Sequence, residues 1–396
     1  MLNIKQYFGF LRKRKLRDCV AFGDFDMTFL ALVIILLSIG LVMMFSASYI
    51  NAWYDPEAGN DPYFYIKNQG AFAVIGLIAM FVVSKVRYDV FKDFAFTLLL
   101  VSFFLLLLVL IVPAKIPGKE EFHRWLKMPI VGGTFQPSEI AKLGLVMFCA
   151  WSMERRQKLI EKKWWMMLPY AVIIAFMCGL VYMENHLSGT ILMLCIGLVM
   201  TYLGGIKAGW YVFALFAFAG AAALLISNPD ILKKYAGDRI VAWRDEDYDP
   251  MGARWQINQS LYAIGSGGLF GLGLGNSKQK HLYMPEPQND FVFSIACEEL
   301  GFIRCILIIL LFVLLVWRGF VIAMRAKDRF SSLLVMGIIF QVGLQAALNI
   351  AVVTGTVPNT GISLPFFSYG GTSLTILLTE MGMVLSVSRY SKIRKK

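Results

Sequence analysis

HLYMPEPQNDFVFSIACEELGFIRCILIILLFVLLV, residues 281–316, passes from a polar loop with two prolines into a long apolar run. The run over 291–316 is long enough to cross about 30 Å of hydrocarbon as one helix. Nine more apolar runs have this length and character. They lie near residues 27–50, 68–84, 93–113, 137–153, 165–183, 188–204, 209–227, 330–355 and 370–388. The sequence therefore predicts an all-α polytopic membrane protein with ten transmembrane helices.

The composition agrees with a chain that lies mostly in a bilayer. Of 396 residues, 58% are hydrophobic, which argues against the two or three soluble domains that this length would otherwise suggest. No heptad pattern, fixed-period repeat or low-complexity linker divides the chain, so we expect one domain over residues 1–396. The six cysteines have no metal-ligand or Cys-x-x-Cys spacing, and we expect them to be free thiols.

The positions of the Lys and Arg residues predict the orientation. About twice as many of the 38 lie on the side that carries both termini as on the other side, and this bias marks the cytoplasm. We therefore expect cytoplasmic basic tails over 1–26 and 389–396. The segment 228–290 becomes the fourth and largest outer loop, and 114–136 and 358–371 also lie outside. The net charge of +12 is accounted for by membrane tethers, so no nucleic acid partner is expected.

Asp290 is the residue with the strongest indication of function. An acid at a membrane boundary is disfavoured unless it faces protein or a water-filled cavity. The structural alternative is that Asp290 caps a helix that begins at Phe291, as Asp often does. A cap does not account for Glu298 and Glu299, which lie about two helical turns deeper.

Basic and aromatic residues precede the fourth predicted span. Pro137 at a helix start with Glu139 in the first turn is good N-terminal chemistry and is explained by structure alone. Lys142 lies inside an apolar span, where three alternatives are open: it snorkels outward, it pairs with Glu139, or it binds an anionic headgroup together with Arg124. Trp125 is more typical of an interface anchor than of a ligand platform.

The outer loop 228–290 contains a predicted short helix and a glycine run. Ile257, Leu261 and Ile264 recur at helical spacing, which is typical of a helix that lies in the membrane interface. The glycines over 265–275 offer backbone N–H groups to a phosphate, but no nucleotide-binding motif is present. A hinge between the helix and the loop is the favoured interpretation.

Three other polar features remain. The segment 184–190 reads as a polar turn, because His186 has no second histidine at helical spacing for a metal. The segment 358–371 is too rich in Gly and Pro for continuous helix, and we expect irregular backbone that lines a cavity. Arg304 and Glu380 would be costly in lipid, so we expect them to pair inside the bundle.

The motifs taken together resemble those of the SEDS family (shape, elongation, division, sporulation). They are GLVMMFSAS from Gly40, Arg124-Trp125, QPSE at 136–139 with Lys142, QINQSLYAIGSGG, PEPQNDFVFS, EELGF and SLPFFSYGGTS. The resemblance covers nearly the whole chain, and its wording is closer to the division member FtsW and the sporulation member SpoVE than to the elongation member RodA. Two departures stand out. Asn185-His186-Leu187-Ser188-Gly189-Thr190 replaces the common Pro-Asp-Leu-Gly-Thr turn, and Arg304 replaces a small residue.

The resemblance implies a function. Members are expected to have ten transmembrane helices and to polymerise lipid II as peptidoglycan glycosyltransferases at the outer face of the cell membrane, in division or sporulation. The implied partners are a class B penicillin-binding protein and other divisome or cell-wall synthesis proteins. The resemblance makes Asp290 essential. The motif positions implied to bind substrate are Arg124, Trp125, Gln136, Ser138, Glu139, Lys142, Gln259, Ser260, Glu286 and Ser368.

The chemistry gives these residues roles. Joining two lipid-linked disaccharides needs a base for the attacking sugar hydroxyl, and Asp290 fits that role with inversion at the anomeric carbon. The departing undecaprenyl diphosphate needs positive charge, which Arg124 and Lys142 would supply with a divalent cation, Mg²⁺ or Mn²⁺, as a further candidate. Two other classes remain. A lipid II flippase would use the same basic cavity, although no repeat symmetry is visible. A non-enzymatic division scaffold would tolerate replacement of Asp290.

Overall fold

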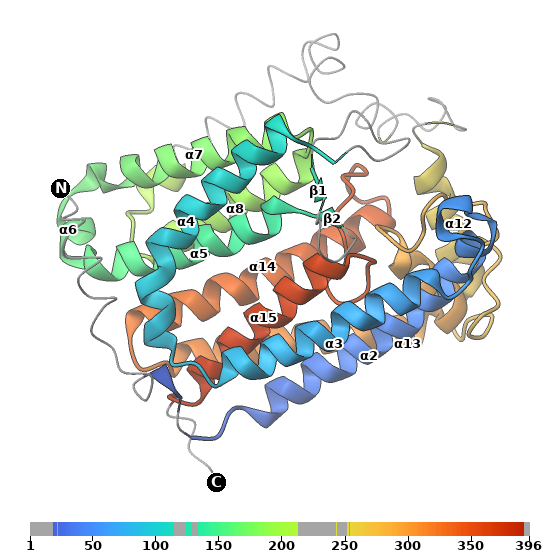
Figure 1. The fold of residues 1–396 in the computed structure, drawn as a ribbon, viewed down its shortest axis with the longest axis horizontal. Coiled ribbons are helices and arrows are strands. Elements are labelled where there is room, and N and C mark those ends of the chain that lie inside the picture. The colour runs from blue at the N-terminus through green and yellow to red at the C-terminus, as the bar shows by residue number, and fades with distance from the viewer. Residues whose placement is uncertain are drawn as a thin grey trace.

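The computed structural model describes residues 19–21, 23–114, 124–127, 134–212, 243, 252 and 254–391. These residues form a bundle of long helices with one two-stranded antiparallel sheet (Figure 1). The helices are α2 Met27–Tyr54, α3 Phe64–Ser84, α4 Tyr88–Ile111, α5 Pro137–Arg155, α6 Gln157–Lys162, α7 Met167–Met183, α8 Leu187–Leu203, α12 Trp255–Gly267, α13 Val292–Met324, α14 Arg329–Val353 and α15 Gly371–Ser388. The short 3-10 helices are η2 Pro56–Ala58 and η3 Trp164–Met166, and the strands are β1 Leu126–Lys127 and β2 Thr134–Phe135.

Seven of the described helices are long and apolar enough to cross a membrane, which fits a multi-pass membrane protein. They are α2, α3, α4, α7 together with η3, α13, α14 and α15. α8 is apolar but has only 17 residues, and α5 matches a predicted span in position but carries Glu139 and Lys142 near its start. Most of the predicted span over 209–227, both tail ends and much of the outer loop lie outside the described residues. The count of ten therefore stays a prediction.

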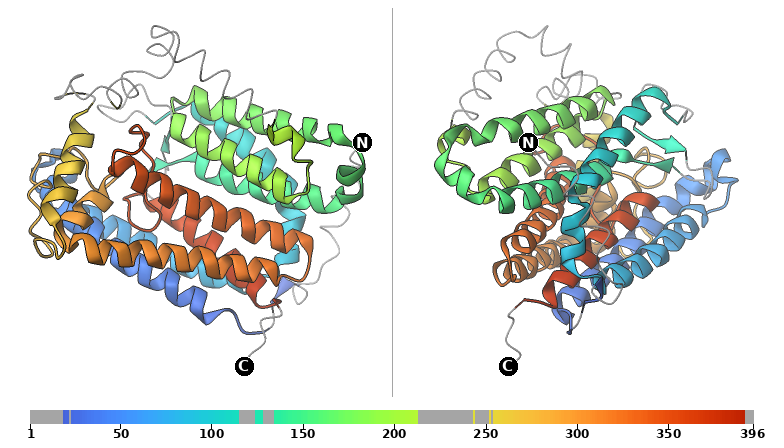
Figure 2. Two further views of the ribbon diagram at one scale, coloured as in Figure 1. Left: turned by 180° about the vertical axis from the view of Figure 1, so that it is seen from behind. Right: turned by 60° about the vertical axis from the view of Figure 1, so that its left-hand side comes forward.

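α14 and α15 occupy the middle of the bundle. The views from behind and from the side show them between one group formed by α2, α3 and α13 and another formed by α4, α5, α7 and α8 (Figure 2). Glycines allow the closest of these contacts. A Cβ on Gly382 of α15 would lie 2.6 Å from the Met80 carbonyl oxygen of α3, and one on Gly40 of α2 would lie 2.3 Å from that of Phe366. Both positions therefore require the absence of a side chain.

The two ends of the described chain meet at one end of the bundle. Val20 pairs with Val86 in an isolated bridge, and the guanidinium of Arg389 donates to the Gly23 carbonyl. The buried Asp26 accepts hydrogen bonds from the Arg318 guanidinium at 2.7–3.1 Å. This arrangement agrees with termini on one side of the membrane. Their cytoplasmic location stays a prediction.

α13 breaks at Gly301, whose φ is 79°, and the glycine run of the preceding loop packs against the break. The amide of Leu272 donates to the Glu298 carbonyl at 3.0 Å, and that of Phe302 donates to the Gly268 carbonyl at 2.9 Å. A Cβ on Gly271 would lie 2.2 Å from the Glu299 carbonyl oxygen. Gly267 and Gly271 thus allow close backbone packing that satisfies groups freed by the kink, whereas a Cβ on Gly265, Gly268 or Gly275 would meet nothing within 4 Å. The glycines do not line the cavity described below, and the amides of Gly271 and Gly273 already donate to carbonyls, which argues against the phosphate cradle. The hinge stays a prediction.

Glu298 and Glu299 are fully buried and hold the outer loop onto α13. Glu299 forms a salt bridge with Lys280 at 2.8 Å and accepts a hydrogen bond from the Ser46 hydroxyl at 2.7 Å. Glu298 accepts from the amide of Lys278 at 2.9 Å and from the Ser277 hydroxyl. The cost of burying these carboxylates in an apolar segment is therefore offset by hydrogen bonds and an ion pair from a loop about 20 residues earlier in the chain.

The predicted pair of Arg304 and Glu380 is wrong. Arg304 follows the Gly301 kink, is exposed, and donates to the carbonyls of Phe270 at 2.9 Å and Leu300 at 3.3 Å. Glu380 is fully buried in α15, where the Gln341 amide donates to it at 3.2 Å. Arg304 is used instead to satisfy carbonyls near the kink.

Candidate functional site

A polar cavity of about 1100 Å³ lies at the end of the bundle where α5, α8 and α15 begin. Its walls come from α3, α5, α8, α12, α14 and α15, the segments around β1 and β2, the loop before α13 and the irregular segment between α14 and α15. The last of these segments confirms the expectation that irregular backbone lines a cavity. The volume is sufficient for a large polar ligand.

The cavity brings together most of the residues that the sequence singled out. The predicted site residues among its lining are Arg124, Trp125, Gln136, Ser138, Glu139, Lys142, Glu286, Asp290 and Ser368. They come from four separate parts of the chain, so their convergence is a property of the tertiary structure. Their roles stay predictions.

Asp290 faces the cavity and does not cap α13. The helix begins at Val292 with Phe291 as N-cap and no side-chain cap, so the capping interpretation is wrong. The Asp290 carbonyl accepts a hydrogen bond from the Asn349 amide at 2.7 Å. A Cβ on Gly361 would lie 3.1 Å from Asp290 Oδ2, so a glycine gives the carboxylate its room. The side chain is held against the irregular segment at the cavity wall.

Lys142 is buried and paired across the cavity wall. Its Nζ lies 2.9 Å from Glu139 Oε1 and donates to Gln345 Oε1 at 3.4 Å. The Gln345 amide in turn donates to the Ser363 carbonyl at 3.1 Å. The lysine side chain is 4% exposed, so it does not snorkel outward. Of the sequence alternatives, the pair with Glu139 is present, and the same ammonium group lines the cavity.

Arg124 and Trp125 approach the cavity from the segment before β1. The Arg124 guanidinium donates to the Asn185 carbonyl in the turn between α7 and α8. The Trp125 carbonyl accepts from the Ala114 amide at 2.7 Å, which ties this segment to the chain that follows α4. Trp125 is half-buried and lines the cavity, so its position is not that of a simple interface anchor.

Glu286 and Ser368 are placed by local turns. Glu286 is exposed, has a φ of 46°, and accepts from the Asn289 amide at 2.8 Å. The Ser368 hydroxyl accepts from the Leu364 amide at 2.7 Å, and its carbonyl accepts from the Gln69 amide at 3.1 Å. Ser368 therefore shapes the irregular segment, whereas Glu286 is an exposed lining residue on the loop before α13.

Gln259 and Ser260 do not line the cavity. The predicted helix is present as α12, but its buried face includes Ser260, whose hydroxyl lies 2.6 Å from that of Ser294 and donates to the Val353 carbonyl at 2.6 Å. Leu261, expected on the apolar face, is 39% exposed. Through the Ser260 hydroxyl, α12 docks onto Ser294 of α13 and Val353 of α14. Gln256 on the same helix does line the cavity and accepts from the Asn359 amide at 2.9 Å.

Sequence reasoning missed the amide side chains of α14. Gln341 and Gln345 line the cavity, and Asn349 holds both Asp290 and Ile362 through their carbonyls. These three residues recur at every fourth position of an apolar helix, which places them on one helical face. The spacing of these amides in the sequence indicates a polar helical face inside the bundle.

The turn between α7 and α8 holds two buried titratable groups. Glu184 is fully buried, and neither carboxyl oxygen has a hydrogen-bond partner among the described residues. Burial raises the pKa of Glu184 to about 8, against an opposing effect of Arg124. Burial, with the charges of Arg124 and Lys142, lowers the pKa of His186 to about 3. At neutral pH the histidine is uncharged, and the carboxyl is mostly protonated.

This turn gives a pH-dependent prediction. The folded pKa of Glu184 lies above the ordinary value of 4.5, so its stability contribution is lost as the pH rises from about 4.5 to about 8. Glu184→Gln removes that loss. At pH 9 it should raise the thermal midpoint by an amount that corresponds to about a few kcal/mol in the free energy of unfolding. At pH 5 the change should be much smaller. The exposed carboxyl of Glu161, changed in the same way, is the control. An equal shift at both pH values would contradict the buried, protonated state.

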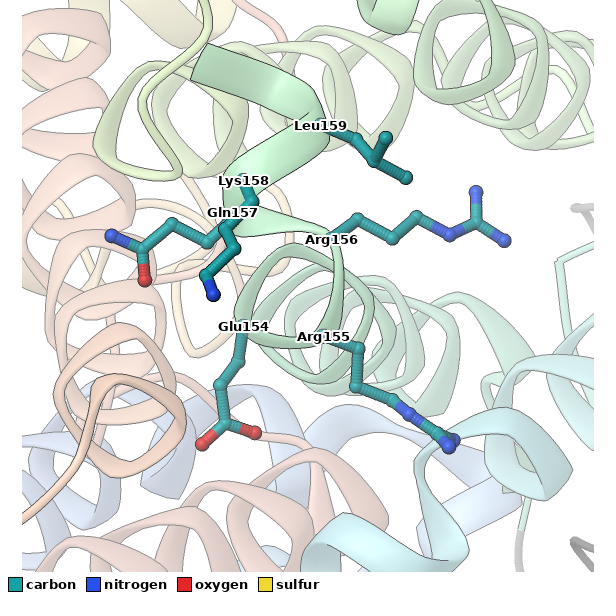
Figure 3. A pocket seen from close by; sticks show the side chains of 6 residues that line it. All are labelled: Glu154, Arg155, Arg156, Gln157, Lys158 and Leu159. Atoms are coloured by element: carbon teal, nitrogen blue, oxygen red, sulfur yellow. The ribbon is translucent and has the colours of Figure 1, made fainter. Parts of the chain in front are cut away.

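A second, smaller hollow has no site character. It has a volume of about 210 Å³ and is lined by the six consecutive residues Glu154 to Leu159 at the junction of α5 and α6. Figure 3 shows their side chains pointing in different directions rather than toward one centre. Glu154 is already paired with Lys92.

The described residues form a helical membrane protein whose polar cavity combines acidic, basic and amide side chains at one end of the bundle. The fold and this cavity define a class of multi-pass helical membrane proteins with a polar cavity at one end of the bundle. The family model FtsW/RodA/SpoVE, described as a cell cycle protein, matches residues 26–393. The chain belongs to this family, which confirms the resemblance to the SEDS family.

Relatives support the assignment over nearly full length. The chain is 42% identical over 371 residues to "Stage V sporulation protein E" of Bacillus subtilis, covering 93% of this chain and 98% of that protein. It is 40% identical over 365 residues to "Probable peptidoglycan glycosyltransferase FtsW" of a Geobacter species, covering 92% and 96%.

Solved structures show the same fold. A structure described as "Structural coordination of polymerization and crosslinking by a peptidoglycan synthase complex" matches with a TM-score of 0.75 and 28% identity, covering 93% of this chain and 99% of that one. The rod shape determining protein RodA of Thermus thermophilus matches with a TM-score of 0.66 and 27% identity, covering 93% and 98%.

Proposed function

We propose that this chain is a peptidoglycan glycosyltransferase that polymerises lipid II into glycan strands at the outer face of the cell membrane, in division or sporulation. The observation that carries the proposal is one cavity that holds Asp290 together with Arg124 and Lys142. An acid and two cations are the groups that this transfer needs. Relatives named as peptidoglycan glycosyltransferases support the assignment.

In the proposed reaction, the carboxylate of Asp290 takes the proton of the acceptor 4-hydroxyl as the oxygen attacks the anomeric carbon of the donor. A new C–O bond forms with inversion, and the bond to undecaprenyl diphosphate breaks. Its electron pair leaves with the diphosphate. Arg124 and Lys142 would stabilise that developing charge, which is most effective in a cavity that excludes bulk water.

A divalent cation, Mg²⁺ or Mn²⁺, is proposed only as a companion of the substrate. Among the described residues no group of three or more His, Cys, Asp or Glu side chains could hold a metal ion. The described part of the chain therefore does not fit a resident metal site, and no step above depends on one. Mg²⁺ commonly takes its ligands from one or two carboxylates and from phosphates of the substrate.

The proposed partners are a class B penicillin-binding protein and other divisome or cell-wall synthesis proteins. A likeness to a structure of a peptidoglycan synthase complex supports a synthase partner. The proposed location is the cell membrane, with the cavity open to the outside.

The test is a reconstituted assay. Purified full-length protein in lipid vesicles is supplied with lipid II, with and without a class B penicillin-binding protein and with Mg²⁺, Mn²⁺ or a chelator, and the products are separated by length. Glycan strands are the expected result. Movement of lipid II across the bilayer without polymer would support the flippase alternative instead. The absence of both activities would support the scaffold alternative.

A further inference from the structure

Two helices begin side by side at the cavity. Gln136 is the N-cap of α5 and His186 is the N-cap of α8, and Gln136 Nε2 lies 3.4 Å from His186 Nδ1. Neither N-cap side chain makes a capping hydrogen bond. Figure 1 shows the two helices adjacent, with their starts near β1 and β2. Two positive helix ends therefore face one region of the cavity wall.

Each helix places a buried serine at the same position of its first turn. Ser138 is the second residue of α5 and Ser188 is the second residue of α8, and they are 2% and 1% exposed. Both hydroxyl oxygens lack a hydrogen-bond partner among the residues that the structure describes, although both residues line the cavity. A buried hydroxyl without a partner costs stability. A ligand that accepts hydrogen bonds would satisfy both groups at once.

The basic groups nearest the two helix starts favour an anion. Arg124 and Lys142 line the cavity, and the charges of both act on His186. The acid nearest in sequence to Ser138, Glu139, is paired with Lys142, and Glu184 holds its proton at neutral pH because burial raises its pKa to about 8. Gly189 completes the wall, because a Cβ there would lie 2.5 Å from His186 Nδ1 and would displace the ring.

We propose that the paired starts of α5 and α8, with the hydroxyls of Ser138 and Ser188, form a subsite for the diphosphate group of a polyprenyl-linked sugar. The two serines donate to phosphate oxygens, and the two helix dipoles stabilise the negative charge. The preference for an anion follows from the contacts above, whereas the identity of its carrier rests on the proposed function. Ser188 becomes a binding residue with no counterpart among the predicted site residues.

The experiment measures binding rather than turnover. Full-length protein in nanodiscs of neutral lipid is titrated calorimetrically with inorganic pyrophosphate and with farnesyl diphosphate. Ser138→Ala and Ser188→Ala should each weaken both ligands about tenfold, since each removes a hydrogen bond to a charged group. Without ligand, their thermal midpoints should stay unchanged or rise, because each substitution removes an unsatisfied hydroxyl.

Ser102→Ala is the matched control. Ser102 is also fully buried, but its hydroxyl donates to the Leu98 carbonyl at 2.8 Å, and it does not line the cavity. This variant should lose thermal stability and keep its affinity for pyrophosphate. Serines with only a structural role would behave like Ser102.

The outcomes separate the subsite from the proposed function. Normal pyrophosphate affinity in the Ser138→Ala, Ser188→Ala double variant would overturn the subsite, whether or not the protein polymerises lipid II. Weakened affinity in that variant, in a protein that makes no glycan, would retain the subsite and overturn the proposed function. Nanodiscs with phosphatidylglycerol form a further arm. If they reduce pyrophosphate binding as strongly as farnesyl diphosphate does, the subsite accepts a general lipid phosphate and the diphosphate assignment is overturned.

Discussion

Asp290→Asn is expected to lower glycan polymerisation by about 10²- to 10⁴-fold, which is the usual contribution of a general base. The amide cannot take the proton of the attacking hydroxyl, although it has the same shape as the carboxylate. Folding should be preserved, because the hydrogen bond from Asn349 to this position uses the backbone carbonyl of Asp290. The measurement is the rate of strand formation from lipid II by the purified protein with its penicillin-binding partner.

The control for this substitution is Asp61→Asn. Asp61 is an acid of the loop between α2 and α3, forms a 2.6 Å salt bridge with the exposed Lys67, and does not line the cavity. The Asp61→Asn variant should polymerise lipid II at the normal rate. Retained polymerisation by Asp290→Asn, with an unchanged thermal midpoint, would reject Asp290 as the general base.

Lys280→Met is expected to lower the free energy of unfolding by about 3–5 kcal/mol, the usual effect of removing one partner of a buried ion pair. Lys280 Nζ lies 2.8 Å from Glu299 Oε1 and also donates to the Gly275 carbonyl at 2.7 Å. Methionine fills a similar volume but leaves the Glu299 carboxylate buried without its counter-charge. The change is measured as a fall in the thermal midpoint of the detergent-solubilised protein.

Two further variants test the cause. Lys67→Met breaks a salt bridge whose side chains are 67% and 37% exposed, and it should change the thermal midpoint little, because solvent screens exposed ion pairs. Glu299→Gln added to Lys280→Met should recover part of the lost stability, since the unpaired charge is then gone. Equal effects of Lys280→Met and Lys67→Met would show that the buried network contributes little. The same network holds the loop that carries Asp290, so a loss of activity should accompany the loss of stability.

Much of the candidate site was predictable, but for reasons that differ between residues. The charge of Asp290 at a membrane boundary and of Lys142 inside an apolar run could be interpreted from elementary physics. Family motifs alone predict Gln136, Ser138 and Ser368 as site residues, because nothing in their local sequence separates a ligand contact from a helix start or a turn. Gln259 and Ser260 entered in the same way and were misplaced, since a motif does not say which face of its helix meets the cavity.

The residues that were missed share a physical reason. The amides of α14 repeat at every fourth position, yet an inward polar stripe has a meaning only when its neighbour is known. Ser188 looks like an ordinary polar residue of a turn until α5 is seen to begin beside α8. A pair of Arg304 with Glu380 is predicted because a lone charge in lipid is costly. In the structure, Arg304 instead donates to nearby carbonyls, and Glu380 accepts from the Gln341 amide.

Local composition was enough to predict the membrane-spanning helices of the described residues and their approximate bounds. In hydrocarbon the backbone must satisfy its own hydrogen bonds, so an apolar run of sufficient length has few alternatives to a helix, and this depends only on local composition. The tertiary structure alone decided which polar groups meet. The contacts of Lys280 with Glu299, of Gln136 with His186 and of Asn349 with Asp290 join residues that are 19, 50 and 59 positions apart. Such contacts arise from the packing of whole helices, and no local pattern of residues specifies them.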